Sequence, residues 1–442
     1  MLSPNEILAL AMVASFFVLL LAGIPVGIGI ASSALVFGYL GFGPMLFSLL
    51  PARVYGVVTN YSLMAVPLFV FMGVMLEKSR LAEELLDVVG HLFGRLAGGM
   101  AVGIVLVGVL LGASTGIVGA TIVTLGLLTL PALLRRGYAK GLATGTICAS
   151  GTLGQIIPPS LVLILLSEVL GLSVGTLFAA AMLPGLVLAA IYVIAIIVVA
   201  SLRPDLAPPI DADERAAMGR GELLRRVTTV VLPPLGLVVA VLGSIIGGVA
   251  APTEAASMGA IGALLIVIVA RKFSLHLLFD VARTTVLIST MVFFILICAQ
   301  AFALSFRGLG GEQLVHRMFE WVPGGVTGSL LFLLALIFVL GLFLEWIEIT
   351  FIAVPLFLPF FIQNNVDLVW LGVLIALNLQ TSFLTPPFGW ALFFLKGVAP
   401  PGVGTGDIYR GVLPFIGLQL VAVAVVFLLP GLATWLPGAI GW

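Results

Sequence analysis

Charged residues are scarce in this 442-residue chain. Only 9% of its residues are Asp, Glu, Lys or Arg, whereas about a quarter are charged in an average globular protein. The formal net charge is zero and no long basic run occurs, so the charge pattern predicts no nucleic-acid partner. Hydrophobic residues make up 62% of the chain. This composition is that of an integral membrane protein embedded in a lipid bilayer.

Cysteine and histidine are also rare, which limits covalent and metal chemistry. Cys148 and Cys298 lie in apolar stretches, where a thiol acts as a small hydrophobic group, so no disulfide is expected. The histidines, His91, His276 and His316, are isolated in sequence, and no transition-metal site is predicted. No apolar stretch offers the aspartate pair or the serine and histidine that an intramembrane enzyme needs, so no enzymatic activity is expected.

Long apolar stretches dominate what is present. A helix needs about 20 apolar residues to cross a bilayer, and the chain holds roughly ten to a dozen such stretches. Lipid offers the backbone no hydrogen-bond partner, so an all-α polytopic fold is predicted. The first stretch follows Glu6 without a preceding Lys or Arg, unlike a cleaved signal peptide, and is expected to be a membrane helix. A single helix is predicted at 54–76, and amphipathic arms at 79–95 and 310–322.

Prolines within the apolar stretches recur at a nearly constant spacing. We call its commonest value, 228 residues, the repeat interval. The numbers of Pro25 and Pro252 differ by 227 (252 − 25), and those of Pro158 and Pro386 differ by 228 (386 − 158). The difference is again 228 for Pro131 with Pro359 and for Pro159 with Pro387. This recurrence predicts two internal repeats, at residues 1–202 and 227–442. The polar stretch between them, 203–226, contains five arginines and is expected to be a cytoplasmic linker by the positive-inside rule.

Positive charges predict that the repeats are inverted relative to each other. Lys and Arg flank both ends of the stretch at about 100–134, so it is expected to be a re-entrant hairpin that opens to the cytoplasm. The matching stretch at about 326–362 has few positive flanks and is expected to open to the periplasm. With both termini periplasmic, all Lys and Arg fall on the cytoplasmic side except three, Arg53, Arg307 and Arg317.

The double prolines predict one interrupted helix in each repeat, at about 138–170 and about 368–398. Such a break frees carbonyl groups that can coordinate a cation and leaves helix N-termini that favour an anion. Inverted repeats with matching broken helices are typical of secondary transporters, whose site lies near the bilayer midplane. Two plainer alternatives are a simple proline kink and, at Gly112 and Gly116, a small-residue packing face.

Each interrupted helix is expected to face the tip of its hairpin. The first tip, at 112–119, offers the hydroxyl groups of Ser114 and Thr115, and oxygen ligands suit a hard cation such as sodium. The second tip carries Glu345 and Glu348, spaced to share one helical face. An acid at the bilayer centre costs about 2.5–3.5 kcal/mol on insertion scales. These acids are therefore predicted to accept a proton, balance a cation or bind substrate; alternatively, they lie at the hairpin mouth in outer water.

Three segments resemble the large membrane subunit of tripartite ATP-independent periplasmic (TRAP) transporters, the DctM-like family: GASTGIVGATIVTLGLLTLPALLRRGY, GTLGQIIPPS and NLQTSFLTPPFGWALFFLKG. The resemblance covers nearly the whole chain. It implies an elevator-type, sodium-driven importer of organic acids in the bacterial inner membrane. It also implies two partners, a small four-helix membrane subunit and a periplasmic substrate-binding protein. A stand-alone sodium- or proton-coupled symporter for di- or tricarboxylates remains the alternative.

The resemblance also implies sodium ligands. A first ion would be bound by Ser114 and the backbone oxygens of Gly154, Ile157 and Pro159. Adding the repeat interval to the last three places a second ion at Ser382, Thr385 and Pro387. The residues expected to gate substrate or ions are Thr115, Gly116, Thr152, Glu345, Glu348 and Thr381.

Overall fold

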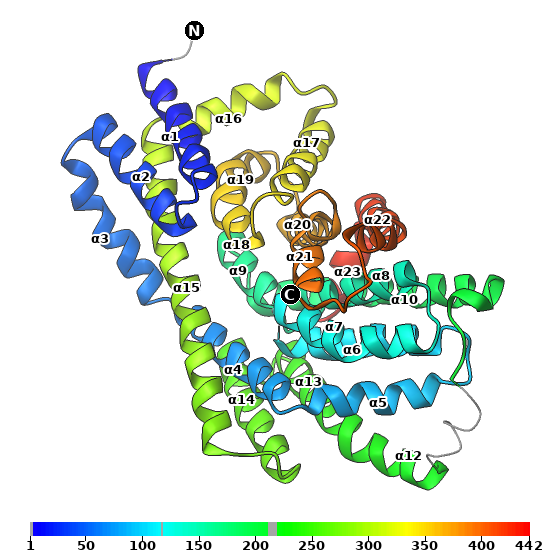
Figure 1. Cartoon of the computed structure of the whole chain (residues 1–442). Helices are drawn as coiled ribbons and strands as arrows, with labels where there is room; N and C mark the ends of the chain where they lie inside the picture. Colours follow the sequence, from blue (N-terminus) through cyan, green and yellow to red (C-terminus); the bar gives the residue numbers. More distant parts are fainter. Residues whose placement is uncertain (1–2, 116–117, 211–218) are drawn as a thin grey trace.

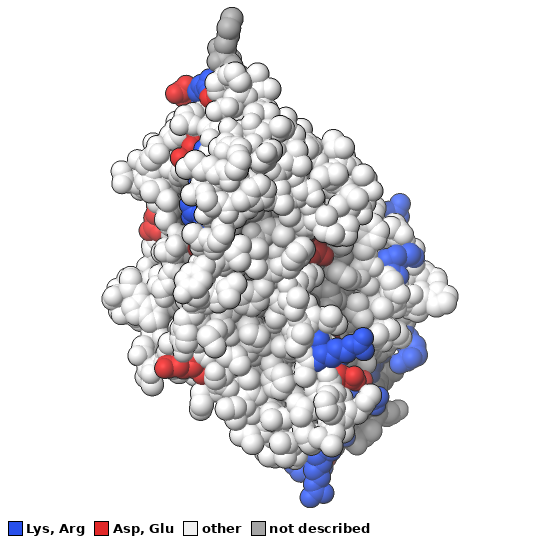
Figure 2. Space-filling view, turned by 90° about the vertical axis from the view of Figure 1, so that its left-hand side faces the viewer, with Lys and Arg blue, Asp and Glu red and all other residues white. Residues whose placement is uncertain are grey.

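The computed structural model describes residues 3–115, 118–210 and 219–442, and every regular element in these ranges is helical (Figure 1). Nine of the described helices are long and apolar enough to cross a bilayer. The number is ten if the pair Gly311–Glu320 and Gly325–Leu340, bent by 112°, counts as one span. Figure 2 shows a mostly uncharged face, with most of its Lys and Arg at the lower right and a few near the upper left. The all-α polytopic fold is therefore confirmed.

The described residues of the first half form ten α-helices. They are α1 (Pro4–Leu21), α2 (Val26–Phe42), α3 (Met45–Val58), α4 (Ala65–Lys78), α5 (Leu81–Phe93), α6 (Gly99–Thr115), α7 (Val118–Arg135), α8 (Lys140–Thr152), α9 (Leu161–Leu170) and α10 (Val174–Leu202). Of the predicted linker, residues 211–218 lie outside the described ranges, and its cytoplasmic location stays a prediction.

The second half repeats this order with small additions. It follows a short linker helix, α12 (Arg220–Arg226), and its helices are α13 (Leu232–Ile246), α14 (Pro252–Val269), α15 (Leu275–Gly308), α16 (Gly311–Glu320), α17 (Gly325–Leu340), α18 (Trp346–Glu348), α19 (Val354–Gln363), α20 (Leu368–Leu384), α21 (Trp390–Val398), α22 (Thr405–Leu428) and α23 (Gly431–Ala439). A π-helical turn, η5 (Ile349–Ala353), joins α18 to α19.

The repeat interval also relates the helices of the two halves. Helix α8 begins at Lys140 and α20 begins one repeat interval later, at Leu368. Helix α7 ends at Arg135 and α19 ends one repeat interval later, at Gln363. Figure 1 shows the hairpins α6–α7 and α17–α19 on opposite sides of the interrupted helices α8–α9 and α20–α21. This is the arrangement of inverted repeats, each with a re-entrant hairpin and an interrupted helix.

The halves differ where the single helix was predicted at 54–76. The first half has two helices, α3 and α4, separated by a 3-10 turn at Tyr61–Met64, whereas the second half has the continuous α15. The cause is local. Asn60 has an extended backbone, and its side chain accepts a 2.9 Å hydrogen bond from the backbone N–H of Ser62. An Asn in this position caps a new helical turn, so α3 ends before it.

Helices α1–α4 and α13–α15 form a frame in which the halves interlock. Helix α2 packs along α15, and α14 packs along α4. Glycine permits the first contact, because a Cβ on Gly27 would lie 2.5 Å from the ring of Phe294. Further along, the Ser305 hydroxyl donates a 2.8 Å hydrogen bond to the carbonyl of Ala34. Each half thus supplies a helix that supports the long helix of the other.

Two amphipathic arms, α5 and α16, connect the frame to the rest of the molecule. Helix α5 buries Leu81, Leu85 and Val88, while its acidic edge includes Glu84, which pairs with Lys272 of the second half at 2.9 Å. Helix α16 is held in the same way, since its Arg317 forms an ion pair with Glu6 of α1. Apart from the linker helix α12, the remaining helices, α6–α10 and α17–α23, form a second body that we call the block.

Within the block, α8 and α22 pack close together at glycines. A methyl group on Gly145 would collide with the carbonyl of Gly411, whereas one on Gly141 would come no closer than 3.6 Å to Gly411.

We expect Gly145→Ala to destabilise the purified protein by about 1–3 kcal/mol through overpacking, lowering its thermal unfolding midpoint. Gly141→Ala is the matched control and should leave the midpoint unchanged. Equal midpoints for the two variants would contradict this packing.

Candidate functional site

Both double prolines interrupt a helix, as predicted. Helix α8 ends at Thr152, a 3-10 turn covers Leu153–Gln155, and α9 begins only at Leu161. In the second half, α20 ends at Leu384 and α21 begins at Trp390. The Pro158–Pro159 and Pro386–Pro387 peptide bonds are both cis. The last carbonyls of α8 and α20 therefore leave the regular helical hydrogen-bond pattern, which makes them available as oxygen ligands.

Each hairpin touches the break of its interrupted helix. A Cβ on Gly112 at the end of α6 would lie 2.5 Å from the Cα of Gly154. A Cβ on Gly341 after α17 would lie 2.6 Å from the Cβ of Ser382. Ser382 follows Gly154 by one repeat interval, so the same contact occurs in both halves. Glycine is needed in each hairpin because any side chain would push the tip away from the break.

The residues predicted for the first sodium ion lie at the first break. Gly154 belongs to the buried 3-10 turn, and Ile157 is 4% exposed. Pro159 follows the cis bond and is buried. The next residue fixes the local backbone, because the Ser160 hydroxyl donates a 2.7 Å hydrogen bond to the carbonyl of Gln155. The side chains of Ser114 and Thr115, and the whole of Gly116, lie outside the described part of the structure.

The residues predicted for the second ion surround the second break. Ser382 is fully buried and its hydroxyl donates a 2.7 Å hydrogen bond to the carbonyl of Leu379. Thr385 ends α20 with an extended backbone. The carbonyl of Pro387 accepts a 2.6 Å hydrogen bond from the Tyr409 hydroxyl, so one of its two lone pairs is used. The residue one repeat interval before Tyr409 is Ala181, so the two breaks are not chemically identical.

Thr152 and Gln380, which occupy equivalent positions of the two repeats, contact each other. The Gln380 side-chain amide nitrogen donates to the Thr152 hydroxyl oxygen at 3.3 Å. Residues at equivalent positions of two repeats meet only near the axis that relates the repeats, so the interrupted helices cross there. The neighbouring Thr381 is buried, and its hydroxyl donates to the Leu377 carbonyl at 2.9 Å. Gln380 was not predicted, although adding the repeat interval to Thr152 identifies it.

Several buried polar atoms near the breaks have no hydrogen-bond partner among the described residues. They are both amide atoms of Gln155, the amide oxygen of Gln380, and the hydroxyls of Ser150 and Thr350. Buried polar groups are normally paired, so these atoms are the ones that an ion, a water molecule or a polar solute can satisfy. Sequence reasoning missed Gln155, because one glutamine in an apolar stretch gives no spacing pattern.

Contrary to the prediction, the two acids of the second hairpin, Glu345 and Glu348, do not share a helical face. Glu345 has an extended backbone (φ −73°, ψ 160°) and precedes α18, whereas Glu348 lies inside that short helix. The chain must turn at the hairpin tip, so the helix begins only after Glu345. Glu348 is 4% exposed, which also rules out the alternative that it lies in outer water. Its Oε2 atom has no hydrogen-bond partner in the described chain.

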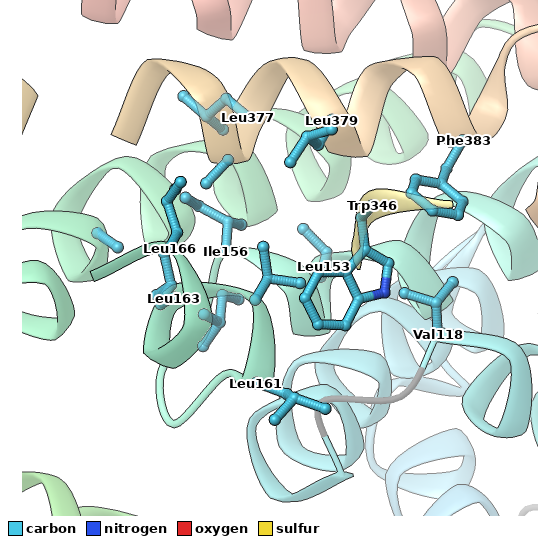
Figure 3. Packing of buried hydrophobic residues seen from close by; sticks show 14 of the residues in the cluster. Val118, Leu153, Ile156, Leu161, Leu163, Leu166, Trp346, Leu377, Leu379 and Phe383 are labelled. Atoms are coloured by element: carbon cyan, nitrogen blue, oxygen red, sulfur yellow. The ribbon is translucent and has the colours of Figure 1, made fainter. Parts of the chain in front are cut away.

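A cavity of about 430 Å³ lies between the frame and the hairpin tips. Its lining includes Glu77 of α4, Met291 of α15, and Glu345 and Trp346 of the second hairpin. Figure 3 shows Trp346 among buried residues of the first hairpin and both interrupted helices, Val118, Leu153, Leu161 and Phe383. Trp346 thus joins all four elements at one point. The cavity falls within the roughly 300–1,000 Å³ typical of small-molecule sites.

Residues 13–432 match the family described as the DctM component of the tripartite ATP-independent periplasmic transporter. The chain belongs to this family. It is therefore the large permease subunit of a TRAP transporter, a multi-pass membrane protein that works with a periplasmic binding protein and usually a small membrane subunit. The homologues are transporter permeases, in line with the absence of enzymatic motifs in the sequence.

Two relatives and one solved structure illustrate the DctM family. The C4-dicarboxylate TRAP transporter large permease protein DctM of Pseudomonas aeruginosa is 30% identical over 405 residues, 90% of this chain and 92% of the relative. The ectoine TRAP transporter large permease protein TeaC of Halomonas elongata is 29% identical over 434 residues, 96% of this chain and 98% of the relative. The Alcanivorax borkumensis YdaH transporter has a TM-score of 0.64 at 15% identity, covering 98% of this chain and 99% of its own, and supports the fold alone.

The crossing of the interrupted helices can be tested by Thr152→Val. This substitution keeps the side-chain shape but removes the hydroxyl oxygen that accepts the hydrogen bond from the Gln380 amide. We expect a loss of about 1–3 kcal/mol, because a buried amide group is left unpaired. Thr129→Val is the matched control, since that buried hydroxyl donates only to Leu125 of its own helix. Thermal unfolding of the purified variants measures the difference. Adding Gln380→Leu to Thr152→Val should restore most of the loss, and equal effects of the two valines would contradict the pairing.

Proposed function

We propose that this DctM-family subunit couples the inward movement of sodium ions to the uptake of a small carboxylate. A periplasmic binding protein would deliver the substrate to the bacterial inner membrane. One observation carries the proposal: the hairpin-to-break contact recurs, at Gly112 with Gly154 and at Gly341 with Ser382. Two equivalent breaks in buried backbone support two equivalent cation sites.

The available ligand chemistry supports sodium. The candidate ligands are carbonyl oxygens at Gly154, Ile157 and Pro159 in one site, with Ser114, and oxygens of Ser382, Thr385 and Pro387 in the other. Hard cations prefer such oxygen ligands, whereas transition metals prefer thiolate and imidazole groups. Groups of three or more His, Cys, Asp or Glu side chains suited to a metal ion do not occur in the described part of the chain.

The division into frame and block supports an elevator movement. Both hairpins and both interrupted helices belong to the block, so their ion sites would move together. The cavity beside Trp346 lies between α4 and α15 of the frame and the hairpin tips of the block. Sliding of the block against the frame would carry a solute held at this boundary across the membrane. The relative named for C4-dicarboxylate transport supports a carboxylate substrate.

Sodium coupling can be measured in proteoliposomes that contain this chain, its small membrane subunit and its binding protein. With radiolabelled succinate and ectoine as probes, we expect uptake under an inward sodium gradient and none under an equal potassium gradient. Ser382→Ala removes the side-chain hydroxyl oxygen of this candidate site and should raise the sodium concentration for half-maximal uptake about tenfold or more, because an oxygen contact to a charged group is worth about 1.5–3 kcal/mol. Ser167→Ala, which removes a buried hydroxyl bonded within its own helix, should have no effect.

Two results would change this conclusion. Uptake that persists without the binding protein would favour the stand-alone symporter. Uptake that is indifferent to sodium would remove the proposed coupling ion.

Proton involvement is tested separately with Glu348→Gln, which keeps the side-chain size but cannot ionise. We propose that Glu348 exchanges a proton during transport, because its buried Oε2 atom lacks a hydrogen-bond partner among the described residues and lies at the moving tip. The pH dependence of sodium-driven uptake should therefore flatten in this variant. The exposed Glu320→Gln serves as the control. An unchanged profile in Glu348→Gln would end the proton hypothesis.

A further inference from the structure

A second, smaller cavity lies on the other side of the second hairpin. Its volume is about 170 Å³, and its polar lining is Arg53, Glu168, Gln300 and Arg307. Arg53 comes from α3, Gln300 and Arg307 from α15, and Glu168 from α9. The apolar wall includes Phe351 of η5. The cavity is therefore bounded by the frame on one side and by the block on the other.

None of these four residues has the same residue type at the equivalent position of the other repeat. The residues one repeat interval away are Val281 for Arg53, Lys396 for Glu168, Met72 for Gln300 and Ser79 for Arg307. The same helical plan is built in both halves with different side chains at these positions. The helical plan therefore does not require these particular side chains. Arg53 and Glu168 come from the first repeat and Gln300 and Arg307 from the second, and all four meet at this cavity.

The cavity carries an excess of positive charge. Its one carboxylate, Glu168, is already engaged, because the Asn60 side-chain amide donates a 2.6 Å hydrogen bond to it. Arg307 is half-exposed and its Nε lies 3.3 Å from Glu312, which is not part of the lining. Arg53 is exposed. Two guanidinium groups that face one cavity from α3 and α15 are suited to a carboxylate, which they bind through paired hydrogen bonds.

The cavity beside Trp346 has the opposite charge. The charged groups in its lining are Glu77 and Glu345, and no Lys or Arg lines it among the described residues. Helix α15 contributes to both cavities, with Met291 at the acidic one and Arg307 at the basic one. The second hairpin lies between them, since Trp346 lines the acidic cavity and Phe351 the basic cavity. Both lie along one route between frame and block.

We propose that the basic cavity is a carboxylate-binding vestibule on the periplasmic side, where the substrate binds before it passes the second hairpin. This inference rests on the proposed function for the identity of the substrate. Arg53 and Arg307 are two of the three positive residues predicted on that side. At about 170 Å³, the cavity is smaller than a usual small-molecule site of roughly 300–1,000 Å³. It therefore fits a small acid, or one carboxylate end of a larger acid.

The charge difference gives the route a direction. A carboxylate is attracted by the arginines of the vestibule and repelled by the acids of the cavity beside Trp346, where its sodium ions or a proton must balance the charge. Binding is therefore favoured on the side of delivery. Release is favoured once the hairpin has moved and the cations have left.

Arginine modification tests the vestibule on the unmodified protein. The purified large and small subunits, without binding protein, are treated with phenylglyoxal, and the modified arginines are quantified by peptide mass spectrometry. We expect succinate to slow modification of Arg53 and Arg307 at least threefold relative to potassium chloride of equal ionic strength. Arg283 is the control, because it is exposed on the same helix but outside the cavity. Neutral succinamide should protect none of the three arginines.

Equal protection of Arg283, or no protection of Arg53 and Arg307, would overturn the vestibule. A second measurement uses variants in the succinate uptake assay. Arg53→Gln and Arg307→Gln should each raise the half-saturating succinate concentration about tenfold, equivalent to about 1.4 kcal/mol, with the sodium dependence unchanged. Arg283→Gln should leave the half-saturating succinate concentration and the sodium dependence unchanged. If Arg53→Gln and Arg307→Gln also left the half-saturating succinate concentration unchanged, the vestibule would be rejected.

The two proposals fail in different ways. Transport of succinate with no protection of the two arginines would reject the vestibule and keep sodium-coupled carboxylate uptake. Protection of the arginines without sodium-driven uptake of any carboxylate would support the vestibule and reject the proposed function.

Discussion

The structure depends on the fact that lipid cannot form hydrogen bonds with an open backbone. Helices broken at mid-membrane are tolerated only where protein or a polar solute replaces the missing partners. Here the replacement is a hairpin pressed against each break, at Gly112 with Gly154 and at Gly341 with Ser382. Each break is thereby shielded from lipid, while its carbonyl oxygens stay inside the protein where a cation can reach them. The same contact that protects the break creates the candidate ion site.

Duplication extends this solution to the whole transporter. Two inverted copies bring their interrupted helices together at Thr152 and Gln380, equivalent residues that contact each other near the axis between the repeats. The halves also interlock in the frame, where Ser305 of one half bonds to Ala34 of the other. The block thus contains both candidate ion sites, and in the proposed elevator movement the frame would be the support against which the block slides.

Departures from the symmetry place different charged and polar groups in the two halves. The break between α3 and α4 at Asn60 has no equivalent in α15, and the Asn60 side chain holds Glu168 of the block. Arg53 and Arg307 line one cavity and Glu345 the other. Two identical repeats would treat the two sides of the membrane alike. The repeats therefore share one helical plan but present different charged groups at the two cavities.

The sequence by itself determined the helical class, the proline repeat and the interrupted helices, because apolar length, charge bias and proline each act within one segment. The family resemblance directed attention to the breaks around Gly154 and Ser382. Only the tertiary structure decided which side chains meet. Gln380 pairs with Thr152, Trp346 joins four elements, and Glu345 precedes the helix that contains Glu348. These facts follow from the crossing of distant helices and from the turn at a hairpin tip, and neither leaves a periodic signal in the local sequence.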